Sequence, residues 1–210
     1  YIYNSEEDGL KLINTGTIDP YCNYWGKHSL TDKSNHYLRP MLPNNFKVLG
    51  TNRYNLYNSS KIIVAKMSLR LEGFYDEKGE YSSINTNCLH HITISPLKLM
   101  GWIHSKAFQY VYECLFEGLR MAGNYLPFSA PYLSCMYIPL NIDSLDIEEL
   151  VTSIISAKQA DPTADTSEQE RAIDLMVYKL YGLTYDEVKV VDPETTITEE
   201  EYEREISKQS

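Results

Sequence analysis

The sequence lacks the residue spacings that mark common metal centres, disulfide frameworks and nucleotide-binding loops. Its cysteines are Cys22, Cys88, Cys114 and Cys135, and no two of them form a C-x-x-C pair. They therefore predict neither a zinc site nor a disulfide framework, and we expect reduced thiols. No G-x-G-x-x-G or Walker sequence is present, which argues against a glycine loop that cradles phosphate.

The sequence also has no apolar run of membrane-spanning length and no signal peptide, so we expect a cytoplasmic location. Its composition, 43% hydrophobic and 23% charged residues, is typical of a globular protein. The length of 210 residues is enough for one hydrophobic core with an appendage. The first residue is Tyr1 rather than Met, and we expect the chain to be an excerpt whose N-terminal part is missing.

Charge is distributed unevenly along the chain. The formal net charge of −10 at first argues against a nucleic-acid partner. However, residues 1–140 carry 13 basic and 11 acidic residues, whereas residues 141–210 carry 6 basic and 18 acidic residues. Residues 27–70 alone hold eight basic residues and one acidic residue. This asymmetry predicts a basic binding domain at 1–140 joined to an acidic appendage at 141–210.

Local patterns predict the elements of the first part. Residues 61–66 are β-branched and bounded by turn residues, which favours a strand. Ser95 and Pro96 suit the start of a helix, and an apolar stripe predicts one long helix that ends near Gly123. Shorter patterns predict strands at 80–84, 89–94 and 135–140, and a turn-rich segment at 55–60.

Helical patterns dominate after residue 140. Amphipathic helices are expected at 144–158 and 168–181, and capping-box patterns occur at 184–187 and 198–201. The expected fold is therefore α+β. Its parts are a mixed or antiparallel sheet core with one long packed helix, followed by a C-terminal helical appendage.

Candidate catalytic and metal-binding residues are few, and each has a simpler explanation. Cys88 and His90 are two residues apart, so they share one face of a strand without needing a catalytic role. A metal site of His90, His91 and His104 has no helical i, i+4 spacing and no carboxylate nearby. We expect no metal site and no catalytic residue here.

The basic segment at 27–70 is the strongest functional feature. Its Arg and Lys residues are interleaved with Tyr, His and Asn, for example at 36–39 and 51–54. Arg and Lys contact phosphates, while Arg and Asn can also read base edges. A solvated surface unrelated to DNA is the simpler alternative. Glu72 and Asp76, which follow this segment, could pair as carboxylates but are better explained as loop charges.

The pattern of segments along the chain is similar to one known family. The segments that carry the similarity are 12–21, 24–26, 61–72, 76–79, 97–119, 128–140 and 171–191. Together they resemble the C-terminal target-recognition region of type II restriction–modification enzymes. These regions are the TaqI-like specificity domains of adenine-specific DNA methyltransferases, including type IIG enzymes in which restriction and methylation are fused.

The resemblance implies an α+β fold, double-stranded DNA as a partner, and a bacterial cytoplasmic setting. It also implies a parent enzyme that transfers a methyl group from S-adenosylmethionine to adenine. That parent's glycine motif and Asn-Pro-Pro-Tyr-type motif are absent from this sequence. We therefore expect no activity and no cofactor in this chain, and an N-terminal methyltransferase domain of the same parent chain as a second partner.

The resulting hypothesis is that the chain holds duplex DNA in a basic cleft while one adenine is flipped into the separate catalytic domain. Five cations are expected mainly to contact phosphates: Lys47, Arg53, Lys61, Lys66 and Arg70. Three residues are candidates for reading bases: Arg39, Asn52 and Tyr54.

Two alternatives from other functional classes stay open. The chain could be a protein-interaction or structural subunit that works through its acidic helices. It could also be a small cysteine hydrolase built on Cys88. The acidic appendage itself either caps the DNA-binding part or contacts another part of the parent enzyme.

Overall fold

The strand predicted at 61–66 lies at the centre of the β-rich part of the molecule. In the computed structural model, which describes residues 2–4 and 9–206, it is β8 (Lys61–Ala65), and every residue of it is buried. Ile62 and Val64 belong to one hydrophobic cluster, whereas Ile63 and Ala65 belong to another. Because side chains alternate along a strand, β8 is covered on both faces.

The β-rich part contains two main sheets, and β8 is the central strand of the smaller one. A three-stranded antiparallel sheet has the order β10-β8-β12, with β10 (Gly73–Asp76) and β12 (Thr86–His90) at its edges. A four-stranded sheet has the order β1-β7-β2-β11, in which β11 runs parallel to β2 and the other pairs are antiparallel. Its strands are β1 (Tyr3–Asn4), β7 (Pro40–Leu42), β2 (Leu10–Asn14) and β11 (Tyr81–Ile84).

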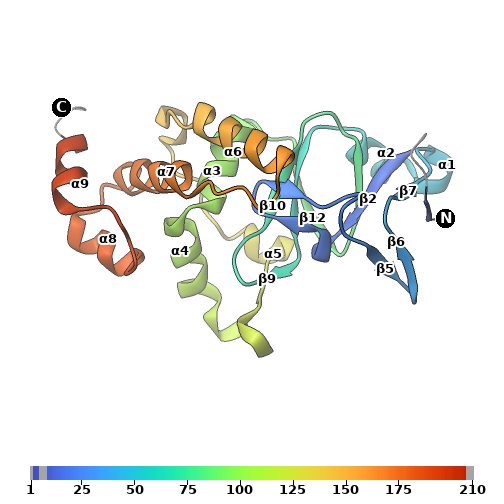
Figure 1. Cartoon of the computed structure of the whole chain (residues 1–210), viewed down its shortest axis with the longest axis horizontal. Helices are drawn as coiled ribbons and strands as arrows, with labels where there is room; N and C mark the ends of the chain where they lie inside the picture. Colours follow the sequence, from blue (N-terminus) through green and yellow to red (C-terminus); the bar gives the residue numbers. More distant parts are fainter. Residues whose placement is uncertain (1, 5–8, 207–210) are drawn as a thin grey trace.

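Short two-stranded ribbons and helices make up the rest of the described chain. The ribbons are β3 (Ile18–Asp19) with β4 (Cys22–Asn23), β5 (Leu30–Asp32) with β6 (Asn35–Tyr37), and β9 (Met67–Ser68) with β13 (Leu126–Pro127). The α-helices are α1 (Phe46–Leu49), α2 (Thr51–Tyr57), α3 (Pro96–His104), α4 (Lys106–Phe116), α5 (Ala130–Leu133), α6 (Glu148–Ala160), α7 (Ser167–Leu180), α8 (Tyr185–Val191) and α9 (Glu199–Ile206). Single 3-10 turns are η1 (Thr15–Thr17), η2 (Glu117–Leu119), η3 (Ala122–Asn124) and η4 (Ile142–Ser144). Figure 1 shows the sheets with α1 and α2 at one end of the molecule and α7 to α9 at the other.

The fold is α+β, with mixed and antiparallel sheets, as the sequence predicted. The prediction of a single long helix is wrong, because the backbone is extended at Ser105 (ψ 154°) between α3 and α4. The Ser105 hydroxyl donates to the carbonyl of Trp102 (2.7 Å) and accepts from the amide of Phe108 (3.2 Å). Serine can satisfy backbone groups in this way, and it therefore favours a helix end over a helix interior.

Three smaller predictions also differ from the structure. The first residues of the segment expected to be turn-rich, 55–60, belong to α2. The helix is held there because Tyr57 is buried and its hydroxyl donates to the carbonyl of Ser83 (3.0 Å). The strand expected at 89–94 lies earlier, as β12. Residues 135–140 form no strand, and Tyr137 and Leu140 within them are almost fully exposed (92% and 104%).

The helices after residue 140 share a core with the elements before it. The predicted helices are present as α6 and α7, and the capping box at Thr184 and Glu187 begins α8. One hydrophobic cluster contains residues of β8, α3, α6, α7 and α8. Gly101 of α3 lies against two of these helices, since a Cβ there would be 3.1 Å from Val151 Cγ2 and 3.5 Å from Ile173 Cγ2. The hydrophobic core therefore includes residues on both sides of residue 140. The boundary predicted there concerns binding roles only, and it stays a prediction.

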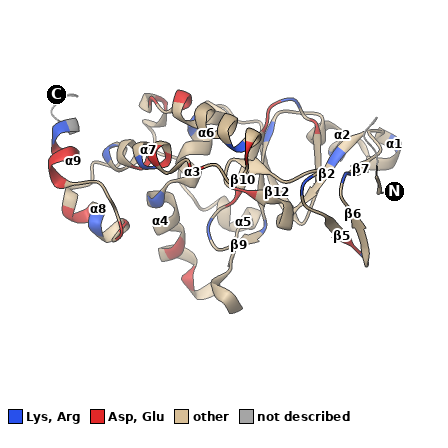
Figure 2. Ribbon diagram, viewed as in Figure 1, with Lys and Arg blue, Asp and Glu red and all other residues tan. Residues whose placement is uncertain are grey.

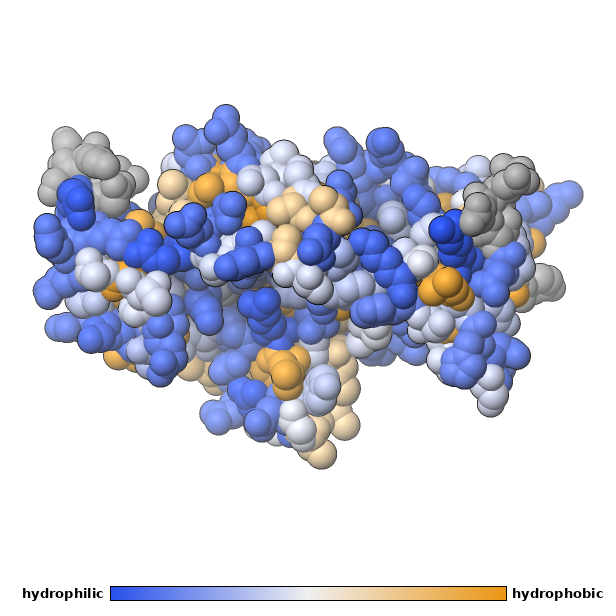
Figure 3. All heavy atoms as spheres, in the orientation of Figure 1, coloured by the Kyte–Doolittle hydropathy of each residue, from blue (hydrophilic) through white to orange (hydrophobic). Residues whose placement is uncertain are grey.

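Charge and hydropathy vary over the surface. Figure 2 shows many acidic residues on α8 and α9 at one end, and basic residues on α1 and β2 at the opposite end. Hydrophilic side chains cover most of the face in Figure 3, with hydrophobic residues where α4 leads into η2. Leu115, Leu119 and Met121 are exposed in that region. Within the described ranges, every helix is too short or too polar to cross a membrane.

Candidate nucleic-acid interface

The helices α1 and α2 form a short corner that carries four of the predicted DNA contacts. The side chain of Asn45 caps α1 by accepting from the amide of Lys47 (2.9 Å). Gly50, whose φ of +75° suits glycine, joins the two helices. Tyr57 fixes the other end of α2 to β11 through the carbonyl of Ser83. The corner is therefore held to the sheet, and most of its other side chains are exposed.

The predicted residues on this corner face solvent. Lys47, Asn52 and Arg53 are exposed. Tyr54 is half-buried, and its ring meets that of Phe46 edge-on, with centroids 6.5 Å apart. Two cations, an amide and an aromatic ring therefore share one exposed corner, which is the residue mixture that contacts phosphates and base edges.

A second group of cations surrounds Trp25. The Arg39 guanidinium lies 6.0 Å from the Trp25 ring centroid, and the Lys11 ammonium lies 5.6 Å from it. The Lys11 ammonium is also 5.1 Å from the Tyr81 ring. The indole N–H donates to the carbonyl of Pro40 (2.8 Å), which fixes the ring. Arg39 is exposed, whereas Lys11 is half-buried and its ammonium also donates to Glu80 Oε2 (3.2 Å).

The sequence prediction included Arg39 but missed Lys11 and Trp25. A signal for Lys11 was present, because Leu10 and Leu12 are apolar and strand alternation places Lys11 on the opposite face. Trp25 had no such signal, since its position depends on Pro40, which is 15 residues away.

Lys61 is not at the surface, and the prediction that it contacts phosphate is wrong. Its ammonium is fully buried and donates to Asp76 Oδ2 (2.5 Å) and to the carbonyls of Tyr57 (2.8 Å) and Ser59 (3.2 Å). Asp76 also accepts from the amides of residues 80 and 81. The interpretation of Asp76 as a loop charge is therefore wrong too, because this ion pair joins α2 to the turn after β10.

Lys66 and Arg70 are exposed, but they lie apart from the α1–α2 corner. Lys66 follows β8, where its amide donates to Thr15 Oγ1 (3.1 Å). The Arg70 guanidinium lies 3.8 Å from the carboxylate of Glu170 on α7. Since α7 and the corner lie towards opposite ends of the molecule (Figure 1), Arg70 borders the helical part.

Cys88, His90, His91 and His104 are the residues considered above as catalytic or metal-binding. Burial raises the pKa of Cys88, and a nucleophilic thiol needs the opposite shift. The rings of His90 and His91 contact each other with centroids 4.5 Å apart. His104 lies in α3, and burial lowers its pKa to about 3. Among residues 2–4 and 9–206, no three His, Cys, Asp or Glu side chains gather closely enough to hold a metal ion.

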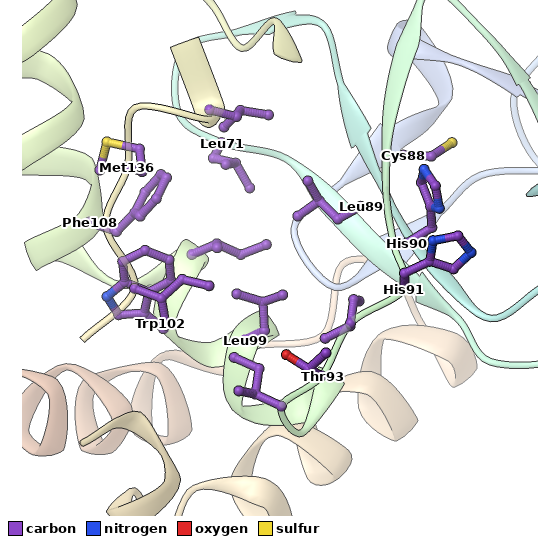
Figure 4. A pocket seen from close by; sticks show the side chains of 15 residues that line it. Leu71, Cys88, Leu89, His90, His91, Thr93, Leu99, Trp102, Phe108 and Met136 are labelled. Atoms are coloured by element: carbon purple, nitrogen blue, oxygen red, sulfur yellow. The ribbon is translucent and has the colours of Figure 1, made fainter. Parts of the chain in front are cut away.

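A cavity of about 430 Å³ lies between β12, the following loop and α3 (Figure 4). His90 and His91 are on one side of it, and Trp102 and Phe108 are on the other. Its remaining lining is mainly aliphatic, including Leu99. The cavity therefore offers mainly hydrophobic contact.

Comparison with models of known protein families and with curated proteins finds no match to this chain. The candidate site is therefore described by the side chains that this chain exposes. Exposed cations beside aromatic and amide side chains gather at the β-rich end, and acidic helices occupy the other end. The structure is therefore that of an α+β protein with exposed cations at one end and acidic helices at the other.

Proposed function

We propose that this chain is a sequence-specific recognition module for duplex DNA. The observation that carries the proposal is the segregation of charge along the molecule (Figure 2). Lys47 and Arg53 are exposed at the β-rich end, whereas the acidic residues of α8 and α9 lie at the far end. DNA phosphates would be attracted to the first end and repelled by the second.

The proposed contacts follow from exposure and neighbours. Lys47, Arg53 and Lys66 contact phosphates, and Arg70 does so at the margin next to Glu170. Base-edge contacts come from a second set: Arg39, Asn52 and Tyr54. Lys61 is left out of both sets because its ammonium is saturated inside the core.

We further propose that the module serves a bacterial, cytoplasmic restriction–modification enzyme that methylates adenine. In this proposal an N-terminal domain of the parent chain binds S-adenosylmethionine and receives the flipped base. The present chain positions the duplex and performs no chemistry. The support is the sequence resemblance at 12–21, 24–26, 61–72 and 76–79, together with the surface chemistry of the β-rich end.

A salt titration of DNA binding tests this proposal. Fluorescence anisotropy of a labelled duplex of roughly 25 base pairs would be followed between about 50 and 200 mM salt. Four phosphate contacts predict that log K falls against log salt with a slope of about −3.6, because each contact releases condensed counterions. A flat response, or no binding even at the lowest salt, would overturn the proposal.

A further inference from the structure

The hairpin formed by β5 and β6 projects from the β-rich end of the molecule (Figure 1). Its strands pair as Leu30 with Tyr37, Thr31 with His36, and Asp32 with Asn35. Leu30 is buried and anchors the base of the ribbon. All residues from 31 to 37 are exposed or half-buried, so the core does not explain their identities.

The turn of this hairpin uses residues that are costly in its backbone conformation. Lys33 and Ser34 have φ angles of +46° and +74°, which define a turn of the type that Asn-Gly or Gly-Gly normally fills. A side chain at positive φ is strained, and such strain tends to be kept where the side chain serves a function. The chain therefore places a lysine at the tip of the ribbon at a cost to folding.

The dimensions of the ribbon match the major groove of DNA. Three residues per strand extend about 10 Å, and paired strands lie about 4.8 Å apart. The major groove of B-DNA is about 12 Å wide and about 8.5 Å deep, and it admits a two-stranded ribbon. The hairpin can therefore reach the floor of the groove while Leu30 stays in the core.

The side chains of the hairpin have the chemistry of base recognition. Asn35 can make paired hydrogen bonds to adenine, and Lys33 can donate to guanine. The Thr31 hydroxyl and His36 Nδ1 lie 3.0 Å apart on the other face, which stiffens the ribbon. Lys27, which precedes β5 and is exposed, suits a flanking phosphate at the base of the hairpin.

We infer that the β5–β6 hairpin enters the major groove and that Lys33 and Asn35 contact base edges there. This inference rests on the proposed function, since it requires duplex DNA as the ligand. It adds a specificity-determining element that is distinct from the α1–α2 corner and from Arg39.

The test begins with selection from a pool of random duplexes by the 210-residue chain. The affinity for the selected duplex is then divided by the affinity for a scrambled duplex of the same composition. Asn35→Ala should lower this ratio by roughly 5- to 150-fold and leave the affinity for the scrambled duplex unchanged. Gln159→Ala, which removes an exposed amide on α6, should leave both values unchanged.

A second variant separates base recognition from folding. Lys33→Asn with Ser34→Gly gives the turn its preferred residues, so the ribbon should stay folded while the tip lysine is lost. This variant should also lose preference for the selected duplex. If both variants keep the wild-type ratio, or if the wild-type chain binds all duplexes equally, the hairpin inference is overturned while DNA binding stands. No binding of any duplex at low salt overturns the proposed function and the inference together.

Discussion

At the scale of single residues, Lys61 is a structural cation, in contrast to the exposed Lys and Arg residues near it in the sequence. Its ammonium and the Asp76 carboxylate are both buried, and every hydrogen bond of the pair connects local segments to each other. Removing one partner of a buried ion pair leaves the other charge uncompensated, which is costly. The role of Lys61 is therefore testable through stability alone.

We predict that Lys61→Met lowers the free energy of unfolding by about 3–5 kcal/mol, because Asp76 would be left buried without its cation. Urea unfolding followed by circular dichroism measures the change. Lys78→Met, which removes an exposed lysine from the neighbouring turn, should change stability by less than about 0.5 kcal/mol. Equal stability of the two variants would contradict this account of Lys61.

Asp174 on α7 is a second residue whose surroundings have a measurable effect, because they raise the pKa of its carboxyl group. Its carboxylate accepts from the amide of Lys106 at the start of α4 (2.8 Å). Burial, and then the nearby Asp192 and Glu170 carboxylates, raise the pKa of Asp174 to about 7 from its ordinary 3.8, while Lys106 opposes the shift. The folded state therefore holds the proton of Asp174 more tightly than the unfolded state does.

This shift predicts how stability depends on pH. Between pH 3.8 and about 7 the folded state binds more protons at Asp174, so its contribution to the free energy of unfolding decreases as pH rises. Asp174→Asn keeps an acceptor for the Lys106 amide but cannot ionise, so its stability should be flatter across this interval. Denaturant midpoints at several pH values measure the effect, with the exposed Asp146→Asn as control. An unchanged pH profile in Asp174→Asn would refute the prediction.

At the scale of elements, Gly101 allows α3 to approach α6 and α7 closely. We predict that Gly101→Ala lowers the free energy of unfolding by about 1–3 kcal/mol, because the new methyl group would press on Ile147 and Val151. Thermal melting checks the size of the loss. Gly118→Ala, where no atom lies within 4 Å of the new Cβ, is the matched control. If Gly101→Ala melts no earlier than Gly118→Ala, the helices do not share the tight core described above.

Local signals in the sequence were sufficient for several elements. The β-branched run of β8, the Ser95–Pro96 start of α3 and the capping box of α8 each depend on neighbouring residues, and the structure contains all three. The α+β fold class could be predicted because these local signals place strands in the first part of the chain and helices after them. Such patterns act within one turn or one strand, where sequence spacing and spatial distance agree.

Features set by distant residues could not be predicted in the same way. The burial of Lys61 depends on Asp76 on the neighbouring strand, and the end of α2 depends on Ser83. The extended backbone at Ser105 interrupts a helical apolar pattern that continues on both sides of it. For the candidate site, the exposed residues of the α1–α2 corner were predicted, whereas the cations around Trp25 emerge only when β2 and β7 pair.

At the scale of the whole molecule, we propose that one end of the chain binds the phosphate backbone of DNA and the other end does not. Two pairs of exposed cations allow a matched comparison. Lys47 and Arg53 lie on the α1–α2 corner, whereas Lys189 and Arg204 lie on α8 and α9. Reversing either pair changes the net charge equally, so a difference in DNA binding would report position rather than total charge.

The most direct test is therefore the affinity of these two charge-reversal variants for one duplex at about 100 mM salt. We predict that Lys47→Glu with Arg53→Glu weakens binding about tenfold or more, because phosphate contacts are replaced by repulsion. Lys189→Glu with Arg204→Glu should stay within about twofold of the wild type. Equal losses in the two variants, or an unchanged affinity after reversal at the α1–α2 corner, would contradict the account.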